Sequence, residues 1–128
     1  MDLSNVTPQK IEEFYSKKDK NYYQNFTTNQ LRNFFSEIVS IRTYYRSNPN
    51  DRDKIELRLR KLKAMLIYAE GRQTGRQNLK ELRKDVFALI DSVLDNRGDF
   101  NKKLETFFDI MEGIVAYHKF YEERKNLN

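Results

Sequence analysis

Apolar residues recur at steps of three and four along four stretches of the chain, with polar residues at the positions between them. This period places the apolar side chains on one face of an α-helix. A strand would show strict alternation between turn signals, and we find no such window. The pattern therefore predicts four long amphipathic helices and no sheet. The predicted core positions, helix by helix, are Leu31, Phe34, Phe35, Ile38, Ile41 and Tyr45; Ile55, Leu59, Leu62, Leu66 and Ala69; Leu79, Leu82, Val86, Leu89, Ile90 and Val93; and Leu104, Phe107, Phe108, Met111, Val115 and His118.

Capping and helix-breaking residues set the limits of these helices. Thr28 is a good N-cap for the first helix, and the turn residues around Pro49 stop it. The segment 71–75, which holds two glycines, ends or bends the second helix, and Gly98 assists the end of the third. The first helix is expected from near Thr28 to before Ser47, and the second from near Asp53 to near Gly71. The third is expected from Leu79 or before to near Asn96, and the fourth from Asp99 to about Arg124.

The first 26 residues are the least regular part, and we interpret them as an N-terminal arm ahead of a bundle formed by residues 27–128. Thr7 and Pro8 are suited to open a short helix, as N-cap and first helical residue. The polar composition of residues 17–26 favours a mobile tail over an arm that docks on a neighbouring subunit. The predicted fold class is all-α: a single compact domain of about five helices, four of them long and amphipathic.

Composition narrows the function classes. With 128 residues, 38% of them apolar and 34% charged, the chain has the size of one domain with one core. No apolar run approaches the roughly 18 to 20 residues that cross a bilayer, and the N-terminus lacks the pattern of a signal peptide. We therefore expect a soluble, cytoplasmic protein that does not associate with membranes.

Residues for catalysis are not visible. The chain has no cysteine, which excludes disulfides, thiolate metal sites and a cysteine nucleophile. His118 is the one histidine, and its position on an apolar helix face indicates a hydrogen-bonded core or interface residue. The common hydrolase, phosphate-loop and dinucleotide motifs are absent, and acids three apart such as Asp109 and Glu112 commonly form surface pairs. We expect no enzyme activity, no metal, no cofactor and no small-molecule substrate.

Positive charge is concentrated in the middle of the chain, whose net charge is +5. Residues 51–84 hold 11 Lys and Arg against 5 Asp and Glu, whereas from Asp85 onward there are 6 basic and 9 acidic residues. A basic middle and an acidic end suit a polyanionic ligand and head-to-tail stacking of copies. The alternative is a solvated helix face with an incidental charge bias.

Three short motifs lie in residues 27–33 (TTNQLRN), 68–72 (YAEGR) and 116–120 (AYHKF). Their order and spacing resemble the small subunit of the type III-A CRISPR-Cas effector, the Csm complex. The resemblance covers about Thr27 to Phe120 and departs from the family at Gly113, where alanine is expected. It implies a compact helical, non-catalytic subunit, several copies of which stack along the groove that holds a guide RNA and its target RNA. The implied protein partners are the backbone and large subunits, which carry the RNA-cleaving site and the DNA-cleaving and cyclic-oligoadenylate-forming sites respectively.

One row on the second helix is the candidate RNA-binding surface. At 100° per residue, Lys54, Arg58, Lys61, Met65, Tyr68 and Arg72 follow one another over about 27 Å. Cations at this spacing neutralise successive phosphates, and a tyrosine can stack on a base. Arg76 would project towards phosphate together with Arg72 once the chain turns at Gly71. The alternative for Arg72 is to bind the last carbonyl groups of the helix and a neighbouring acid, and for Arg32 we favour a buried or semi-buried ion pair over RNA contact.

A second apolar row on the last helix, formed by Ile110, Gly113, Tyr117 and Phe120, makes that helix apolar on two sides. Either this row packs within the chain, with Gly113 allowing another helix to approach, or Tyr117, Lys119 and Phe120 contact another subunit. The rival function from another class is a small helical DNA-binding regulator, in which the helices on either side of residues 71–75 form a helix-turn-helix.

Overall fold

The computed structural model describes residues 1–73 and 78–127 of the chain. Within that part, one 3-10 helix and six α-helices form the fold, and none of these residues belongs to a strand. The all-α bundle predicted from the periodicity is therefore confirmed. The elements in chain order are η1 (Leu3–Asn5), α1 (Pro8–Ser16), α2 (Lys20–Gln24), α3 (Thr28–Ser47), α4 (Arg52–Gly71), α5 (Lys80–Leu94) and α6 (Phe100–Leu127).

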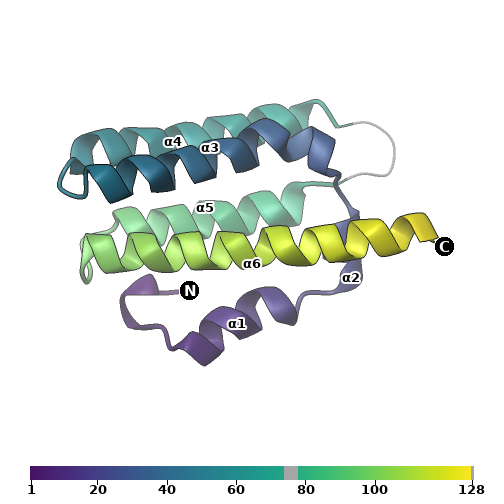
Figure 1. Cartoon of the computed structure of the whole chain (residues 1–128), viewed down its shortest axis with the longest axis horizontal. Helices are drawn as coiled ribbons and strands as arrows, with labels where there is room; N and C mark the ends of the chain where they lie inside the picture. Colours follow the sequence, from purple (N-terminus) through teal and green to yellow (C-terminus); the bar gives the residue numbers. More distant parts are fainter. Residues whose placement is uncertain (74–77, 128) are drawn as a thin grey trace.

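The long helices stack as pairs. Figure 1 shows α3 and α4 side by side above α5 and α6, with α1 below α6. Residue contacts link α3 with α4, α4 with α5, and α5 with α6, while α1 and α2 both pack on α6. Helix α6 thus contacts elements on several sides, which explains why its sequence is apolar on two faces. No helix of the described residues is long and apolar enough to cross a membrane.

Side-chain caps fix where the helices begin. Thr7 caps α1, and Pro8 is its first residue, as predicted. For α3 the cap is Thr27 and not Thr28: the Thr27 hydroxyl accepts from the Gln30 backbone N–H while the Gln30 side chain accepts from the Thr27 N–H at 2.8 Å. Both threonines are chemically suited to the position, but only Thr27 has a glutamine three residues later.

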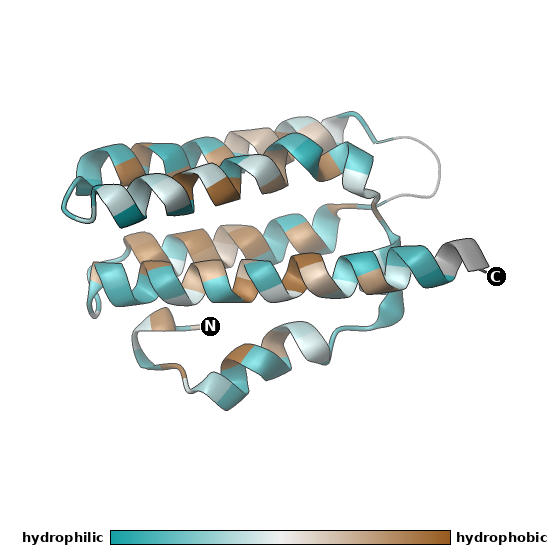
Figure 2. Ribbon diagram, in the orientation of Figure 1, coloured by the Kyte–Doolittle hydropathy of each residue, from teal (hydrophilic) through white to brown (hydrophobic). Residues whose placement is uncertain are grey.

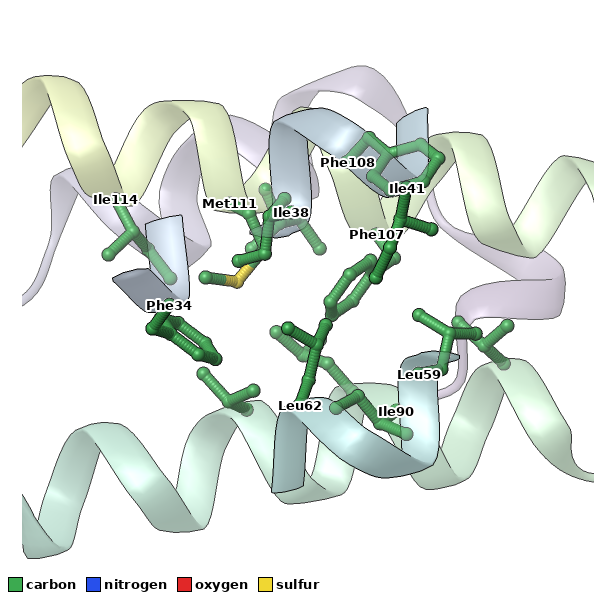
Figure 3. Close-up of a cluster of buried hydrophobic side chains, with 14 of the residues drawn as sticks. Phe34, Ile38, Ile41, Leu59, Leu62, Ile90, Phe107, Phe108, Met111 and Ile114 are labelled. Atoms are coloured by element: carbon green, nitrogen blue, oxygen red, sulfur yellow. The ribbon is translucent and has the colours of Figure 1, made fainter. Parts of the chain in front are cut away.

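The core follows the predicted positions closely. Nearly all of them are buried, and Phe35, Ala69 and Val115 are half-buried at the edge. Figure 3 shows side chains from α3, α4, α5 and α6 that point towards one another in this core. In Figure 2 each of these helices carries hydrophobic and hydrophilic residues in turn along its ribbon. Burial of the apolar stripes is what holds the four helices together.

The N-terminal residues pack on α6 of the same chain. The mobile tail favoured by the sequence interpretation is therefore wrong for this segment. Tyr23 and Phe26 are fully buried, and the Tyr23 hydroxyl donates to the Tyr15 carbonyl. A Cβ on Gly113 would lie 2.3 Å from the Tyr15 ring, so glycine is what lets α1 approach α6 this closely. The ring of Tyr117 meets that of Tyr15 edge-on at 5.4 Å. Of the two alternatives left open for this row, Gly113 and Tyr117 follow the one in which another helix of the chain approaches closely.

A buried lysine closes the connection between α5 and α6. The Lys103 side chain is 1% exposed, and its ammonium group donates to the Asp95 carboxylate at 2.8 Å and to the Asp95 carbonyl at 3.1 Å. The hydrogen bond from Lys103 to the carboxylate, together with one from the Arg97 backbone N–H, lowers the pKa of Asp95 to about 2. Gly98, at a φ of 73°, makes the turn beside Ser4. Together these contacts hold the ends of α5 and α6 beside the N-terminus.

Candidate nucleic-acid interface

A groove of about 610 Å³ lies between the first half of α3 and the last half of α4. The two helices are antiparallel neighbours, so the start of α3 faces the end of α4. The floor is apolar and both walls carry polar side chains. The residues that line the groove are Asn29, Gln30, Asn33, Phe34, Ala64, Met65, Tyr68, Ala69 and Arg72.

Tyr68 and Arg72 form the α4 wall. Tyr68 is 65% exposed, so its ring is open to the groove. The Arg72 Nη1 donates to the Tyr68 hydroxyl at 3.0 Å, and its guanidinium carbon lies 5.4 Å from the ring centroid. The backbone N–H of Arg72 caps the helix, whereas its side chain binds Tyr68. The alternative in which the Arg72 side chain binds helix carbonyls and an acid is therefore wrong for the described residues.

The α3 wall is made of amides. Asn33 is exposed, and its side-chain amide forms no hydrogen bond with any other described residue. The Asn29 Oδ1 accepts from the Arg32 guanidinium at 3.1 Å, and the Gln30 side chain belongs to the capping box. Arg32 itself is exposed and has no acidic partner within residues 1–73 and 78–127. The ion pair predicted for Arg32 is wrong, because its side chain turns along the surface towards Asn29.

The cationic row continues from this groove along the edge between α4 and α3. Lys61 is exposed and pairs with no described acid. The ammonium group of Lys54 lies 4.6 Å from the ring centroid of Tyr44. Arg58 is bound from α3: its Nη2 is 2.8 Å from the Glu37 carboxylate and 2.7 Å from the Ser40 hydroxyl. The positive charge of Arg58 is thus offset within the chain, whereas Lys54 and Lys61 keep theirs.

Other cations of the basic segment have structural partners. Arg83 on α5 donates to Glu70 at 2.7 Å, which ties the Glu of the YAEGR motif to α5, and Lys63 pairs with Asp91. The carboxylate of Glu70 raises the pKa of Arg83. Arg76 lies outside the described residues. Among the described residues of α4 and its C-cap, the cations without an acidic partner therefore include Lys54, Lys61 and Arg72, on one edge of the molecule.

His118 holds the start of α3 against α6. Its ring is fully buried and stacks on Phe26 with centroids 4.4 Å apart. One ring nitrogen lies 3.0 Å from the Tyr23 carbonyl, and the other lies 3.1 Å from the Glu122 carboxylate and 3.3 Å from the Thr28 hydroxyl. Burial lowers the pKa of His118, partly opposed by Tyr23 and Glu122. The predicted hydrogen-bonded core histidine is confirmed.

The three sequence motifs consequently meet at one end of the bundle. Residues 27–33 and 68–72 form opposite walls of the groove, and His118 of the third motif supports the first turn of α3. Among known families, the one described as Csm2 Type III-A matches residues 5–124, nearly the whole chain. The chain belongs to this family. No curated protein and no solved structure matches the chain.

Membership identifies the protein as the small subunit of the Csm complex of type III-A CRISPR-Cas systems. The Csm2 family is a non-catalytic structural subunit, and its partners are the other Csm subunits and the CRISPR RNA. The rival regulator is overturned by this match. The geometry agrees, because α4 and α5 run side by side (Figure 1) instead of crossing as the two helices of a helix-turn-helix do.

The predicted interface residues of α6 divide into two groups. Tyr117 is half-buried and meets the rings of Tyr15 and Tyr23 inside the chain. Lys119 is exposed, and Phe120 is 46% exposed with the Arg124 guanidinium 4.0 Å from its ring centroid. Lys119 and Phe120 therefore lie where a partner can reach them, and Tyr117 has its packing partners within the chain.

Two parts of the site were missed by sequence reasoning. The amide wall of α3 was not predicted, although Asn29 and Asn33 belong to one of the three motifs. The pairing of Arg58 with Glu37 was also missed, since the two residues lie 21 apart with no local signal. The position of the amides one turn apart on α3 was the only available clue.

Proposed function

We propose that this Csm small subunit binds the guide and target RNA through the edge formed by α3 and α4. The observation that carries the proposal is the exposed Tyr68–Arg72 pair at the end of a line that includes the unpaired cations Lys54 and Lys61. Ammonium and guanidinium groups on such a line neutralise phosphates and release counterions. An aromatic ring beside them offers a stacking surface for a base.

The six proposed contact residues are expected to contribute unequally to RNA binding. Lys54, Lys61, Tyr68 and Arg72 are the main contacts, because their side chains are exposed and no described acid neutralises the cations. Arg58 contributes less, since Glu37 offsets its charge. The proposal for Arg76 rests on the sequence alone.

Binding of this kind does not read sequence. The charged side chains of the row are proposed to bind phosphates, and phosphate contacts carry no sequence information directly. This property is what a subunit needs when base pairing with the guide supplies specificity and the protein holds the backbone.

We further propose that copies of the subunit associate with one another and with the backbone and large subunits. Lys119 and Phe120 are the proposed contacts on α6, positioned by Tyr117, which packs against α1 and α2. Residues from Asp85 onward carry 6 basic against 9 acidic groups, a charge bias opposite to that of the basic edge, which would favour the approach of one copy to another.

The test is a titration of the full chain with single-stranded RNAs of permuted sequence at several salt concentrations. We expect weak binding with the same affinity for every sequence and a steep, linear fall of log affinity with log salt concentration. Binding that persists at high salt and prefers one sequence would contradict the proposal.

A further inference from the structure

We infer that the groove between α3 and α4 is a pocket for one unpaired RNA base of any identity, which stacks on Tyr68. This inference rests on the proposed RNA-binding function. It adds a base-binding site to the phosphate contacts proposed for the cationic row. Three features of the groove support this inference: an exposed aromatic ring that contacts Arg72, an apolar floor, and side-chain amides on the facing wall.

The exposed ring of Tyr68 has a side-chain partner at the end of its own helix. Its hydroxyl accepts from Arg72, whose guanidinium carbon also lies 5.4 Å from the ring centroid. Two contacts to the same neighbour restrict the side-chain rotamer, so less conformational entropy is lost when a base stacks on the ring. A tyrosine whose role was only to fill the core would be covered, and Tyr68 is 65% exposed.

The floor suits the face of a planar aromatic ligand. Phe34 is buried beneath the groove, and Met65 is half-buried against the same core. Ala64 and Ala69 complete the floor with small side chains, which leave room above the backbone. The groove volume of about 610 Å³ falls in the range of small-molecule pockets, large enough for a nucleotide.

The facing amides explain why base identity does not matter. A carboxamide presents a donor and an acceptor side by side, and the edge of every base offers a complementary pair. Asn33 has both groups without a partner among the described residues, and Asn29 has committed only its oxygen, to Arg32. Cationic side chains alone would fix phosphates, whereas these amides have no phosphate-neutralising charge and lie across from the ring.

A base inside a duplex has both faces covered by its neighbours and its pairing edge occupied. Only an unpaired base can therefore place a face on Tyr68 and an edge against Asn33. Arg72, which belongs to the same wall, is placed to bind the phosphate of that nucleotide.

The experiment compares two single-stranded RNAs of equal length and equal charge, one native and one with abasic riboses throughout. The full chain should bind the abasic RNA about 5- to 150-fold more weakly, which is the contribution of roughly 1 to 3 kcal/mol for one stacked base. Both RNAs should show the same dependence of affinity on salt, because their phosphates are identical. Tyr68→Ala should remove most of the difference between the two RNAs.

Two further variants separate stacking from other roles of this helix. Ile67→Ala is the matched control: Ile67 is the neighbouring residue and 52% exposed but does not line the groove, so the native RNA should keep its advantage. Asn33→Ala should weaken binding of the native RNA and leave that of the abasic RNA unchanged. A 2-aminopurine base in the native RNA should lose fluorescence on binding the parent chain and not on binding Tyr68→Ala.

Each contrary result has a distinct meaning. Equal affinity of the parent chain for both RNAs, with a normal salt dependence, overturns the base pocket and leaves the proposed RNA function standing. Absence of salt-dependent binding for both RNAs overturns the pocket and the proposed function together. A Tyr68→Ala variant that stays folded by circular dichroism but weakens both RNAs equally also overturns the pocket, because Tyr68 would then act only through Arg72.

Discussion

Replacing Gly113 by alanine tests whether α1 is packed on α6 as described. In an exposed helix interior this substitution stabilises a protein by about 1 kcal/mol, because glycine loses more backbone freedom on folding. At Gly113 the added Cβ would lie 2.3 to 2.5 Å from three carbons of the Tyr15 ring. No side chain tolerates that distance, so either the ring or the whole of α1 must move.

The cost of this movement exceeds the helix-propensity gain. The Tyr15 ring is held edge-on against Tyr117, and the Tyr15 carbonyl accepts from the buried Tyr23 hydroxyl. Overpacking at such a site costs about 1 to 3 kcal/mol. After subtraction of the propensity gain, Gly113→Ala should lower the free energy of unfolding by about 1 kcal/mol and the Tm by about 4 °C.

The assay is denaturant and thermal unfolding of the parent chain, Gly113→Ala, Tyr15→Ala and the double variant, followed by circular dichroism. With the Tyr15 ring removed, Gly113→Ala should change sign and stabilise the chain by about 1 kcal/mol. A stabilising effect of Gly113→Ala in the parent background would refute the close packing of α1 on α6.

The remaining predictions concern α6 and the turn before it. Tyr117→Ala should lower the Tm, because the Tyr117 ring packs on α1 and α2. Phe120→Ala should change the free energy of unfolding by less than about 0.5 kcal/mol and instead impair co-purification with other Csm subunits. Equal Tm values of the two variants would contradict this difference. Gly98→Ala should cost more than about 2 kcal/mol in denaturant unfolding, since alanine is strained at a φ of 73° and its Cβ would also clash with the Ser4 Cβ. An unchanged midpoint would be the contrary result. The pKa of His118 is lowered in the folded chain, so at a pH below the ordinary histidine pKa of about 6.5 the unfolded chain binds more protons than the folded chain. The neutral, buried His118 therefore contributes its full share of the free energy of unfolding above about pH 6.5, and this share is lost as the pH falls below that value. Unfolding measured from pH 7.5 to 5.5 should show this loss, reduced in His118→Gln, and a gain of stability on acidification would contradict it.

The long helices were predictable because each carries its own apolar stripe and its own stop signals. The short helix α2 was not, since five residues form a stable helix only when tertiary packing supports them. Here that support is the burial of Tyr23 against α6, a contact between residues nearly a hundred positions apart. The one-residue error at the start of α3 arose because two adjacent threonines are both suitable caps.

Only the part of the site that lies on a single helix could be predicted from the sequence. The row from Lys54 to Arg72 follows from helical geometry, so its residues could be named from the sequence. Which of its cations remain unpaired depends on what α3 places opposite them, as the pairing of Arg58 with Glu37 shows. The groove likewise could not be predicted, because its walls, which include Asn33 and Tyr68, come from two different helices.

The most direct test of the central claim, that RNA lies along the edge of α3 and α4, compares two triple variants of equal charge. One replaces Lys54, Lys61 and Arg72 by alanine, and the other replaces the exposed Lys10, Lys20 and Lys102 of α1, α2 and α6. The measurement is the slope of log affinity for single-stranded RNA against log salt concentration. The account predicts that the first variant lowers the magnitude of this slope by about 2, at about 0.7 for each phosphate that the protein no longer neutralises, while the second leaves it unchanged. An equal reduction in both variants would show that only net charge matters, and would contradict the assignment of the RNA-binding edge.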